Sequence, residues 1–162
     1  MNIALLIIDV QKAFLAVRKN TKEYNDTLAY INATSTVLRK AGMPVFIIRN
    51  VSEGNDESFN VPDELKVCDK DIDLIKHYSN SFWKTDLEEQ LRKRNVDFVV
   101  VCGTAAEHCV LSTYNGARER GFRGAILQNG VFADSPNGLL DLFYNRPLIS
   151  YSVISYMFEK DI

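Results

Sequence analysis

Short apolar runs alternate along this sequence with segments whose apolar residues recur at helical intervals. Residues 2–9 form one such run, closed by the carboxylate of Asp9, whereas residues 20–41 place apolar side chains four and seven positions after Tyr24. Strands separated by helices pair in parallel through right-handed crossovers, and a strand that is apolar throughout needs cover on both faces. We therefore predict an α/β fold in three layers, an open, mostly parallel, twisted sheet with helices on both faces and the strand order 3-2-1-4-5-6.

The same alternation continues to the end of the chain. We predict further strands over residues 45–49, 97–102, 124–128 and 148–153, and further helices from a capping box at 85–88, from the turn after Gly103 to about Arg120, and over 139–144. Residues 50–73 are polar, and so long a connection is often functional, with room for a third strand or short helices. Because 162 residues with 46% hydrophobic content can bury one core and are too few for two ordinary domains, we expect residues 1–162 to form a single domain.

The charge balance argues against several classes of partner. Lysine and arginine total 19 against 21 acidic residues, so the chain has no basic field for nucleic acid or anionic lipid. Its apolar runs are far shorter than the roughly 20 residues that span a bilayer, and the N-terminus enters a strand pattern without the features of a signal peptide. We expect a cytoplasmic protein that binds neither nucleic acid nor membrane. Its three cysteines, without CxxC spacing, are expected to be thiols.

Two residues of chemical interest fall at the end of the predicted sheet where ligands bind in such folds. Asp9 closes the first strand, and Cys109 lies in the first turn of the helix that follows the strand ending at Cys102. A helix N-terminus carries partial positive charge and free N–H groups, which lower a cysteine pKa and can receive an oxyanion. The pattern predicts a thiolate nucleophile beside a carboxylate. The alternative is structural, with Asp9 as a turn residue and Cys109 as a small buried side chain.

Histidine is the alternative base for a cysteine nucleophile, and the chain contains only His77 and His108. His108 directly precedes Cys109, and adjacent helical side chains diverge by about 100°, so His108 cannot easily take the thiol proton. His77 could reach the crevice from its loop, with a positional or solvent-facing role as the alternative. Two distant histidines without a cysteine pair do not predict a metal site, and no glycine-rich phosphate loop is present. We expect no metal and no cofactor.

Three blocks of the sequence, taken in order, resemble the isochorismatase-like cysteine hydrolases. The first block, LLIIDVQ over residues 5–11, places Asp9 in a DxQ context at the end of the first strand. The second, KHYSNSFWKTDL over 76–87, has a lysine ahead of a Ser-Phe pair and a Thr-x-Leu pattern. The third, VVVCGTAAEHCV over 99–110, has Gly-x-x-x-x-x-Cys-Val opening a helix and is followed by Ser112, Thr113 and Ala117.

This resemblance implies a catalytic triad of Asp9, Lys76 and Cys109. Lys76 fits the family pattern better than Lys84, because Lys84 lies after the Ser-Phe pair. The alternative for Lys76 is an ordinary exposed loop lysine. The family also carries a cis peptide bond in the turn after the glycine, which would here join Thr104 to Ala105.

Further site residues follow from that implied triad. Backbone N–H groups of Ala105 and Cys109 are expected to hold the oxyanion. Phe14, Phe82 and Trp83 are candidate walls of the substrate pocket, with ordinary core or surface aromatics as the alternative.

The sequence also departs from the family pattern. The nicotinamidase branch binds a metal through Asp-x-His and further histidines between the second strand and the lysine, and this chain has no histidine there. The isochorismatase branch proper commonly lacks the cysteine, which is retained here as Cys109. The family's aspartate after the fifth strand is Asn129 in this chain, so local support of the site can differ. At 162 residues the chain is short for the family, which leaves the pocket less covered or completed by a partner subunit.

Together these features predict a cysteine hydrolase that cleaves a carbon–nitrogen bond of a small amide-like molecule through a thioester. The rival hypothesis is a non-hydrolytic binding module, or a redox-sensing thiol, on the same fold. The apolar tail over 148–158 is rich in aromatic residues, and large apolar patches usually mark interfaces. We therefore expect a homo-oligomer, which the resemblance also implies.

Overall fold

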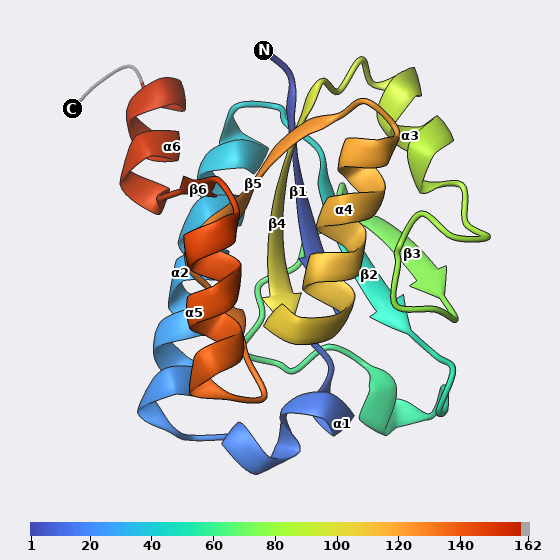
Figure 1. The fold of residues 1–162 in the computed structure, drawn as a ribbon, viewed down its shortest axis with the longest axis vertical. Coiled ribbons are helices and arrows are strands. Elements are labelled where there is room, and N and C mark those ends of the chain that lie inside the picture. The colour runs from blue at the N-terminus through green and yellow to red at the C-terminus, as the bar shows by residue number, and fades with distance from the viewer. Residues whose placement is uncertain (160–162) are drawn as a thin grey trace.

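The computed structural model describes residues 1–159 and contains one parallel sheet with helices on both faces (Figure 1). Its strand order, β3-β2-β1-β4-β5-β6, confirms the predicted topology. The strands are β1 (Ile3–Ile8), β2 (Val45–Asn50), β3 (Ile72–Lys76), β4 (Phe98–Thr104), β5 (Arg123–Phe132) and β6 (Leu148–Ile149). All five pairings are parallel, so the carboxyl ends of the strands lie along one edge of the sheet.

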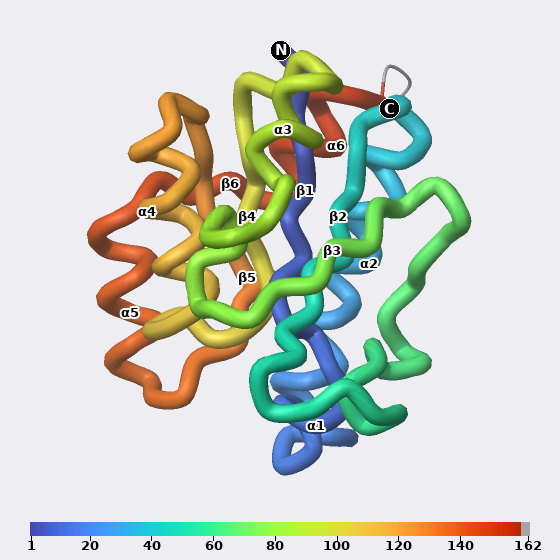
Figure 2. The backbone as a smooth tube through the Cα atoms, turned by 90° about the vertical axis from the view of Figure 1, so that its right-hand side faces the viewer, coloured from blue at the N-terminus to red at the C-terminus, as the bar shows by residue number. Residues whose placement is uncertain are grey.

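The helices form the two outer layers. They are α1 (Lys12–Leu15), α2 (Lys22–Lys40), α3 (Leu87–Lys93), α4 (Leu111–Glu119), α5 (Pro136–Asn145) and α6 (Tyr151–Phe158). Figure 2 shows α4 and α5 on one side of the sheet and α2 on the other. Residues of α3 join the core beneath α4, whereas α6 packs against α2.

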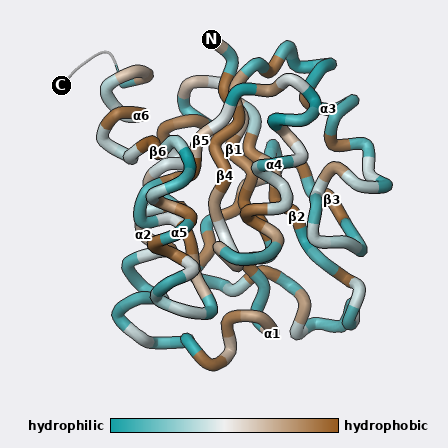
Figure 3. Tube along the Cα trace, in the orientation of Figure 1, coloured by the Kyte–Doolittle hydropathy of each residue, from teal (hydrophilic) through white to brown (hydrophobic). Residues whose placement is uncertain are grey.

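The central strand β1 shows why the sheet needs two covered faces. Its six residues are all buried, and the sheet is the most apolar part of the molecule (Figure 3). Because side chains alternate along a strand, Ala4, Leu6 and Ile8 enter the core under α3 and α4. Ile3, Leu5 and Ile7 enter the core under α2. The continuous apolar run in the sequence is therefore the consequence of a strand that faces helices on both sides.

Several predicted element boundaries are wrong. The strand expected over 124–128 continues to Phe132, and the helix expected over 139–144 begins at Pro136. The expected strand over 148–153 pairs with β5 only at Leu148 and Ile149. Ser150 then caps α6, since its side chain accepts a hydrogen bond from the Val153 N–H at 3.3 Å. The helix lets Ile154 enter the core beside α2, which a continued edge strand would not do. The capping box expected at 85–88 does not form as predicted, because α3 begins at Leu87 and Thr85 Oγ1 accepts from the Leu87 N–H at 3.3 Å rather than from Glu88.

The C-terminal helix leaves part of the aromatic tail exposed. Tyr151 and Phe158 pack partly against the core, whereas Tyr156 is 82% exposed. The homo-oligomer stays a prediction. No helix within residues 1–159 is long and apolar enough to cross a membrane.

Gly103 permits the close approach of β4 to β1 at the carboxyl edge of the sheet. Its φ is +110°, and it pairs with Ile8, the last residue of β1. A Cβ at this position would overlap the Ile8 carbonyl oxygen. Only glycine combines this backbone angle with this spacing, so Gly103 fixes where the chain after β4 leaves the sheet.

Replacing Gly103 by alanine should destabilise the fold more than an ordinary positive-φ substitution does. Gly42 is the matched control, since its φ is +73° but a Cβ there would meet no atom within 4 Å. Gly42→Ala should lower the free energy of unfolding by about 1 kcal/mol. Gly103→Ala should lower it by about 3 kcal/mol or more, because the overlap with Ile8 adds to the backbone cost. Equal losses in denaturant unfolding would contradict this role of Gly103.

Candidate active site

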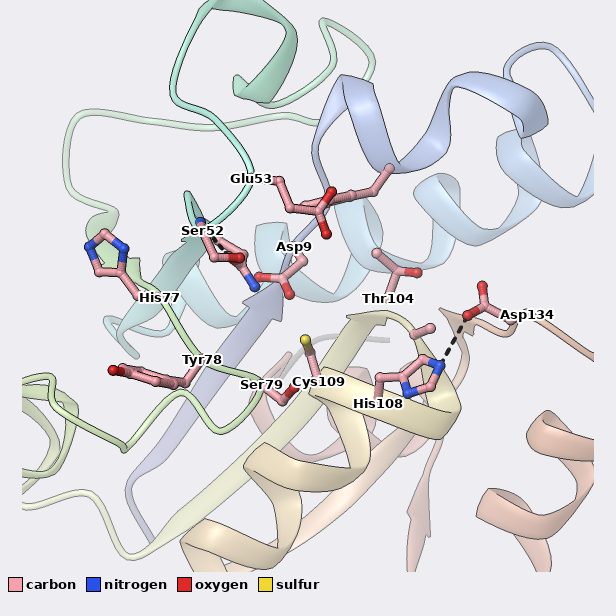
Figure 4. Close-up of a pocket in the computed structure, with 13 residues that line it drawn as sticks. Asp9, Ser52, Glu53, His77, Tyr78, Ser79, Thr104, His108, Cys109 and Asp134 are labelled. Carbon is pink, nitrogen blue, oxygen red and sulfur yellow. Dashed lines mark hydrogen bonds and ion pairs between the residues drawn. The ribbon is translucent and has the colours of Figure 1, made fainter.

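A cavity of about 530 Å³ opens beyond the carboxyl ends of the central strands (Figure 4). Asp9 directly follows β1, and Lys76 is the last residue of β3. Cys109 belongs to a short π-helical turn, Ala106–Val110, that connects β4 to α4. Three segments far apart in the sequence thus bring together the three residues that the sequence resemblance implied.

Asp9 and Lys76 form a buried ion pair at the floor of this site. The Lys76 Nζ donates to Asp9 Oδ2 at 2.9 Å, and the side chains are 0% and 4% exposed. The same ammonium donates to the carbonyl oxygens of Tyr78 at 2.9 Å and Ser79 at 3.4 Å. A lysine can be buried here because its charge is paired and its donors have acceptors.

The second oxygen of Asp9 is free. Asp9 Oδ1 is the only buried side-chain nitrogen or oxygen within residues 1–159 that lacks a hydrogen-bond partner. Burial raises the pKa of the Asp9 carboxyl from its ordinary value, while Lys76 opposes that rise. An unpaired oxygen on a carboxyl whose proton affinity is raised is suited to exchange a proton.

The Cys109 thiol is half-buried, and its Sγ points toward the Asp9 carboxylate (Figure 4). The pKa of this thiol is raised to about 11, mainly by burial and secondly by the negative charge of Asp9. The positive charge of Lys76 acts in the opposite direction. The expected lowering of the cysteine pKa is therefore wrong. The position at the start of a helix does not offset burial next to a carboxylate, so at neutral pH Cys109 is a thiol and needs a base.

The turn after β4 offers a backbone donor close to the sulfur. Thr104 and Ala105 are joined by a cis peptide bond, as the resemblance implied. Ala105 lines the cavity, and no acceptor for its N–H is found within the described part of the chain. Its carbonyl oxygen, by contrast, accepts from the N–H groups of His108 and Val110 at 3.0 and 3.2 Å. A nearly buried N–H without an acceptor can receive a substrate oxygen.

Glu107 fastens the π-helical turn to the segment after β5. Its carboxylate accepts from the N–H groups of Asp134 and Ser135 at 3.0 and 2.9 Å. Although burial acts in the opposite direction, these hydrogen bonds lower the pKa of Glu107. The turn that carries Cys109 is thereby held from both β4 and β5.

Gln11 explains the DxQ context of Asp9. Its side chain is buried, donates to the carbonyl oxygens of Asn50 and Phe59 at 3.0 and 2.8 Å, and accepts from the Asn50 N–H at 2.7 Å. The loop after β2 is thus held against the end of β1. That loop brings Ser52 and Glu53 to the cavity.

The three aromatic candidates for the pocket wall have different positions. Phe14 lines the cavity. Phe82 does not, because it is 4% exposed and packs in the core against the Phe122 ring. Trp83 is 52% exposed and lies outside the cavity as well. Of the three, Phe14 alone lines the cavity, and its role in binding a substrate stays a prediction.

A buried hydroxyl pair accounts for the position of Phe82. Ser81 and Thr113 lie with their hydroxyl oxygens 2.7 Å apart, and the Ser81 N–H donates to Thr113 Oγ1 at 3.0 Å. This pair draws the segment before Phe82 against α4, so that the phenyl ring enters the core.

Both histidines line the cavity without a hydrogen bond to Cys109 in the described structure. His108 Nε2 lies 3.3 Å from Asp134 Oδ2, and its ring is turned toward that residue (Figure 4). His77 lies on the other side of the sulfur. Neither arrangement favours a cysteine–histidine pair. Within residues 1–159, no group of three or more His, Cys, Asp or Glu side chains is placed to hold a metal.

Several cavity residues were not assigned to the site from the sequence. Ser52 and Glu53 come from the long polar connection after β2, for which the only signal was the unusual length and polarity of residues 50–73. Tyr78 and Thr104 also line the cavity, and both lie within the sequence blocks that carry the family resemblance. Asp134, which also lines the cavity, had no signal.

The fold and site define an α/β protein with a cysteine facing a buried Asp–Lys pair at the carboxyl edge of a parallel sheet. Residues 3–141 match the family model described as Isochorismatase domain, and the chain belongs to the isochorismatase family of hydrolases. The isochorismatase family protein YddQ of Bacillus subtilis (strain 168) is 31% identical over 139 residues, covering 80% of this chain and 77% of YddQ. YecD of Escherichia coli O157:H7, another isochorismatase family protein, is 29% identical over 151 residues, covering 82% of this chain and 80% of YecD.

Solved structures have the same fold. N-carbamoylsarcosine amidase from Thermoplasma acidophilum superposes with a TM-score of 0.82 at 27% identity, covering 93% of this chain and 97% of the amidase. The nicotinamidase of Staphylococcus aureus superposes with a TM-score of 0.79 at 20% identity, covering 90% of this chain and 96% of that enzyme.

Asp9→Asn should make the Cys109 thiol more reactive toward an alkylating agent. The aspartate charge raises the pKa of the thiol, so a neutral amide should lower that pKa and increase the thiolate fraction at neutral pH. One pKa unit corresponds to about tenfold more thiolate. The pH dependence of iodoacetamide labelling, followed on the Cys109 peptide, measures the shift, with the exposed Cys68 as internal control. A Cys109 pKa that stayed the same or rose would contradict the assigned role of the Asp9 charge.

Proposed function

We propose that this protein hydrolyses a carbon–nitrogen bond in a small amide-like molecule, with Cys109 as the nucleophile and a thioester as the intermediate. The observation that carries the proposal is the Asp9 carboxylate, toward which the Cys109 thiol points (Figure 4). Lys76 holds its Oδ2, and its Oδ1 has no hydrogen-bond partner within the described residues. A thiol with a pKa of about 11 is a poor nucleophile at neutral pH unless a neighbouring base removes its proton.

Acylation begins when Asp9 accepts the thiol proton and the Cys109 sulfur forms a bond to the carbonyl carbon. The carbonyl electron pair moves onto oxygen, which the N–H groups of Ala105 and Cys109 stabilise. When the carbonyl re-forms, the carbon–nitrogen bond breaks, and Asp9 gives its proton to the departing nitrogen. The products of this half-reaction are an amine or ammonia and the thioester.

Deacylation uses the same carboxylate again. Asp9 accepts a proton from water as the water oxygen attacks the thioester carbon. Collapse of the tetrahedral intermediate breaks the carbon–sulfur bond and releases the acid, and the proton on Asp9 returns to sulfur. A carboxyl whose pKa is raised by burial suits this alternation, because an acid–base catalyst works best when its pKa approaches the working pH.

Lys76 has an electrostatic role in this scheme. Its ammonium opposes the rise in the pKa values of both Asp9 and Cys109, and so favours the ionised carboxylate in the resting enzyme and the sulfur anion during attack. The proposal is also supported by the likeness to N-carbamoylsarcosine amidase, whose name describes an enzyme that acts on an amide-like bond.

The rival hypothesis of a redox-sensing thiol is less well supported. Sensor cysteines react because they are low-pKa, accessible thiolates, whereas the pKa of Cys109 is raised and its side chain is half-buried. A non-hydrolytic binding module would retain the cavity without turnover. Steady release of product from a panel of small amides separates that hypothesis from the hydrolase.

The three site residues should differ in how their replacement affects turnover. Cys109→Ala and Asp9→Asn should each lower kcat by about 10²-fold or more, because the nucleophile or its proton carrier is lost. Lys76→Met should lower the rate at neutral pH but recover part of it as the pH rises, since loss of the ammonium raises the pKa of both partners. Profiles of rate against pH, with folding checked by circular dichroism, measure this. Near-normal turnover in Asp9→Asn together with its loss in His77→Ala would overturn the scheme.

Catalysis should not require a divalent metal ion. The proposed steps use only a carboxylate, an ammonium, a thiol and backbone N–H groups. Activity should therefore survive dialysis against a chelator and remain unchanged when zinc or manganese is added back. Loss on chelation with recovery on adding either ion would contradict a metal-independent mechanism.

A further inference from the structure

We propose that the cavity selects amides that carry a positive charge, and that Glu53 is the residue that recognises this charge. This inference rests on the proposed hydrolase and names its substrate class. Three observations support it: the charge of the cavity, the orientation of Glu53, and an aromatic ring in the cavity lining.

The charges that line the cavity are mostly negative. Its acidic residues are Asp9, Glu53 and Asp134, and among the described lining residues there is no lysine or arginine. His77 and His108 also line it, but they carry charge only when protonated. The cavity thus lacks the fixed cation that would neutralise a substrate carboxylate.

Two of the three carboxylates already have partners. Lys76 holds Asp9, and Asp134 lies 3.4 Å from the Arg18 guanidinium and 3.3 Å from His108. The Glu53 carboxylate, in contrast, takes part in no hydrogen bond or ion pair in the part of the chain that the structure describes. Glu53 therefore supplies the uncompensated charge of the cavity.

Glu53 is directed into the cavity by its loop. Gln11 holds Asn50 at the base of this loop, and the Asn50 side chain accepts from the N–H and hydroxyl groups of Ser52 at 2.8 and 2.7 Å. Figure 4 shows the Glu53 carboxylate turned toward the space above Asp9 and beside Thr104. An amide bound with its carbonyl carbon at Cys109 would place its remaining part near this carboxylate.

An aromatic side chain adds to the recognition of a cation. Phe14 lines the cavity and is held by an edge-on contact with Phe59, with ring centres 5.7 Å apart. Ammonium and guanidinium groups are attracted to carboxylates by charge and to partly exposed aromatic rings by cation–π interaction, and this cavity offers both groups. Lys84 lies 5.4 Å from the centre of the Tyr78 ring but does not line the cavity.

The experiment compares the rates at which cationic and anionic methanethiosulfonates of similar size modify Cys109. Both reagents attack the same thiolate, so the ratio of their rates cancels any change in the pKa of Cys109. The wild type is compared with Glu53→Gln and with Glu57→Gln, a matched control whose acid lies on the same loop outside this cavity. Peptide mapping distinguishes modification of Cys109 from that of Cys68. At Cys68 the ratio of the cationic to the anionic rate should not change in either variant.

The wild type should favour the cationic reagent at Cys109 more strongly than a free thiol does. Glu53→Gln should lower that preference by about fivefold or more at low ionic strength, because one charge beside the thiol is removed. Glu57→Gln should stay within about twofold of the wild type, since the exposed Glu57 carboxylate lies outside the cavity and is screened by solvent. Preference for the anionic reagent, or equal effects of the two substitutions, would overturn the inference.

A second arm separates this inference from the hydrolase itself. 3-Aminopropanamide, butanamide and succinamate present the same amide with a cationic, neutral or anionic end. If the protein hydrolyses these amides, kcat/KM should be highest for 3-aminopropanamide, lower for butanamide and lowest for succinamate. A higher kcat/KM for succinamate than for 3-aminopropanamide would overturn the inference. Reagent selectivity that depends on Glu53, in a protein that hydrolyses no amide, would support the charge preference and reject the hydrolase.

Discussion

The buried ion pair between Asp9 and Lys76 is the interaction on which the site depends. It joins the end of β1 to the end of β3 across β2, and both side chains are almost fully buried. Removing one partner would leave an uncompensated charge in a region of low dielectric. Lys76 occupies one carboxylate oxygen and the other has no hydrogen-bond partner within residues 1–159, which is the geometry that the proposed proton transfer uses.

The fold positions the sulfur by a separate set of constraints. Gly103 lets β4 pass close to the end of β1, and the π-helical turn that follows carries Cys109 back over Asp9. Glu107 fastens this turn to the segment after β5. The result is a thiol whose pKa is raised by burial and by Asp9, so that the proposed mechanism needs the carboxylate as a base.

The sequence predicted the parts of the structure that follow from periodicity. β1 and the positions of Asp9 and Cys109 could be read from an apolar run and the topology rule for parallel sheets. Lys76 could not, because β3 is an amphipathic edge strand with no continuous apolar run, and only the family resemblance indicated this lysine. The thiol pKa was predicted in the wrong direction because burial beside Asp9 is a tertiary effect. Glu53 lies in a loop whose path depends on the distant Gln11 side chain.

In the proposed mechanism Cys109 carries the acyl group during turnover. Mass spectrometry of protein quenched in acid during hydrolysis of a small amide can detect this intermediate. The peptide containing Cys109 should gain the mass of the acyl group without the departing nitrogen, and hydroxylamine should remove this adduct. Continued turnover with Cys109 unmodified, and undiminished in Cys109→Ala, would contradict this mechanism.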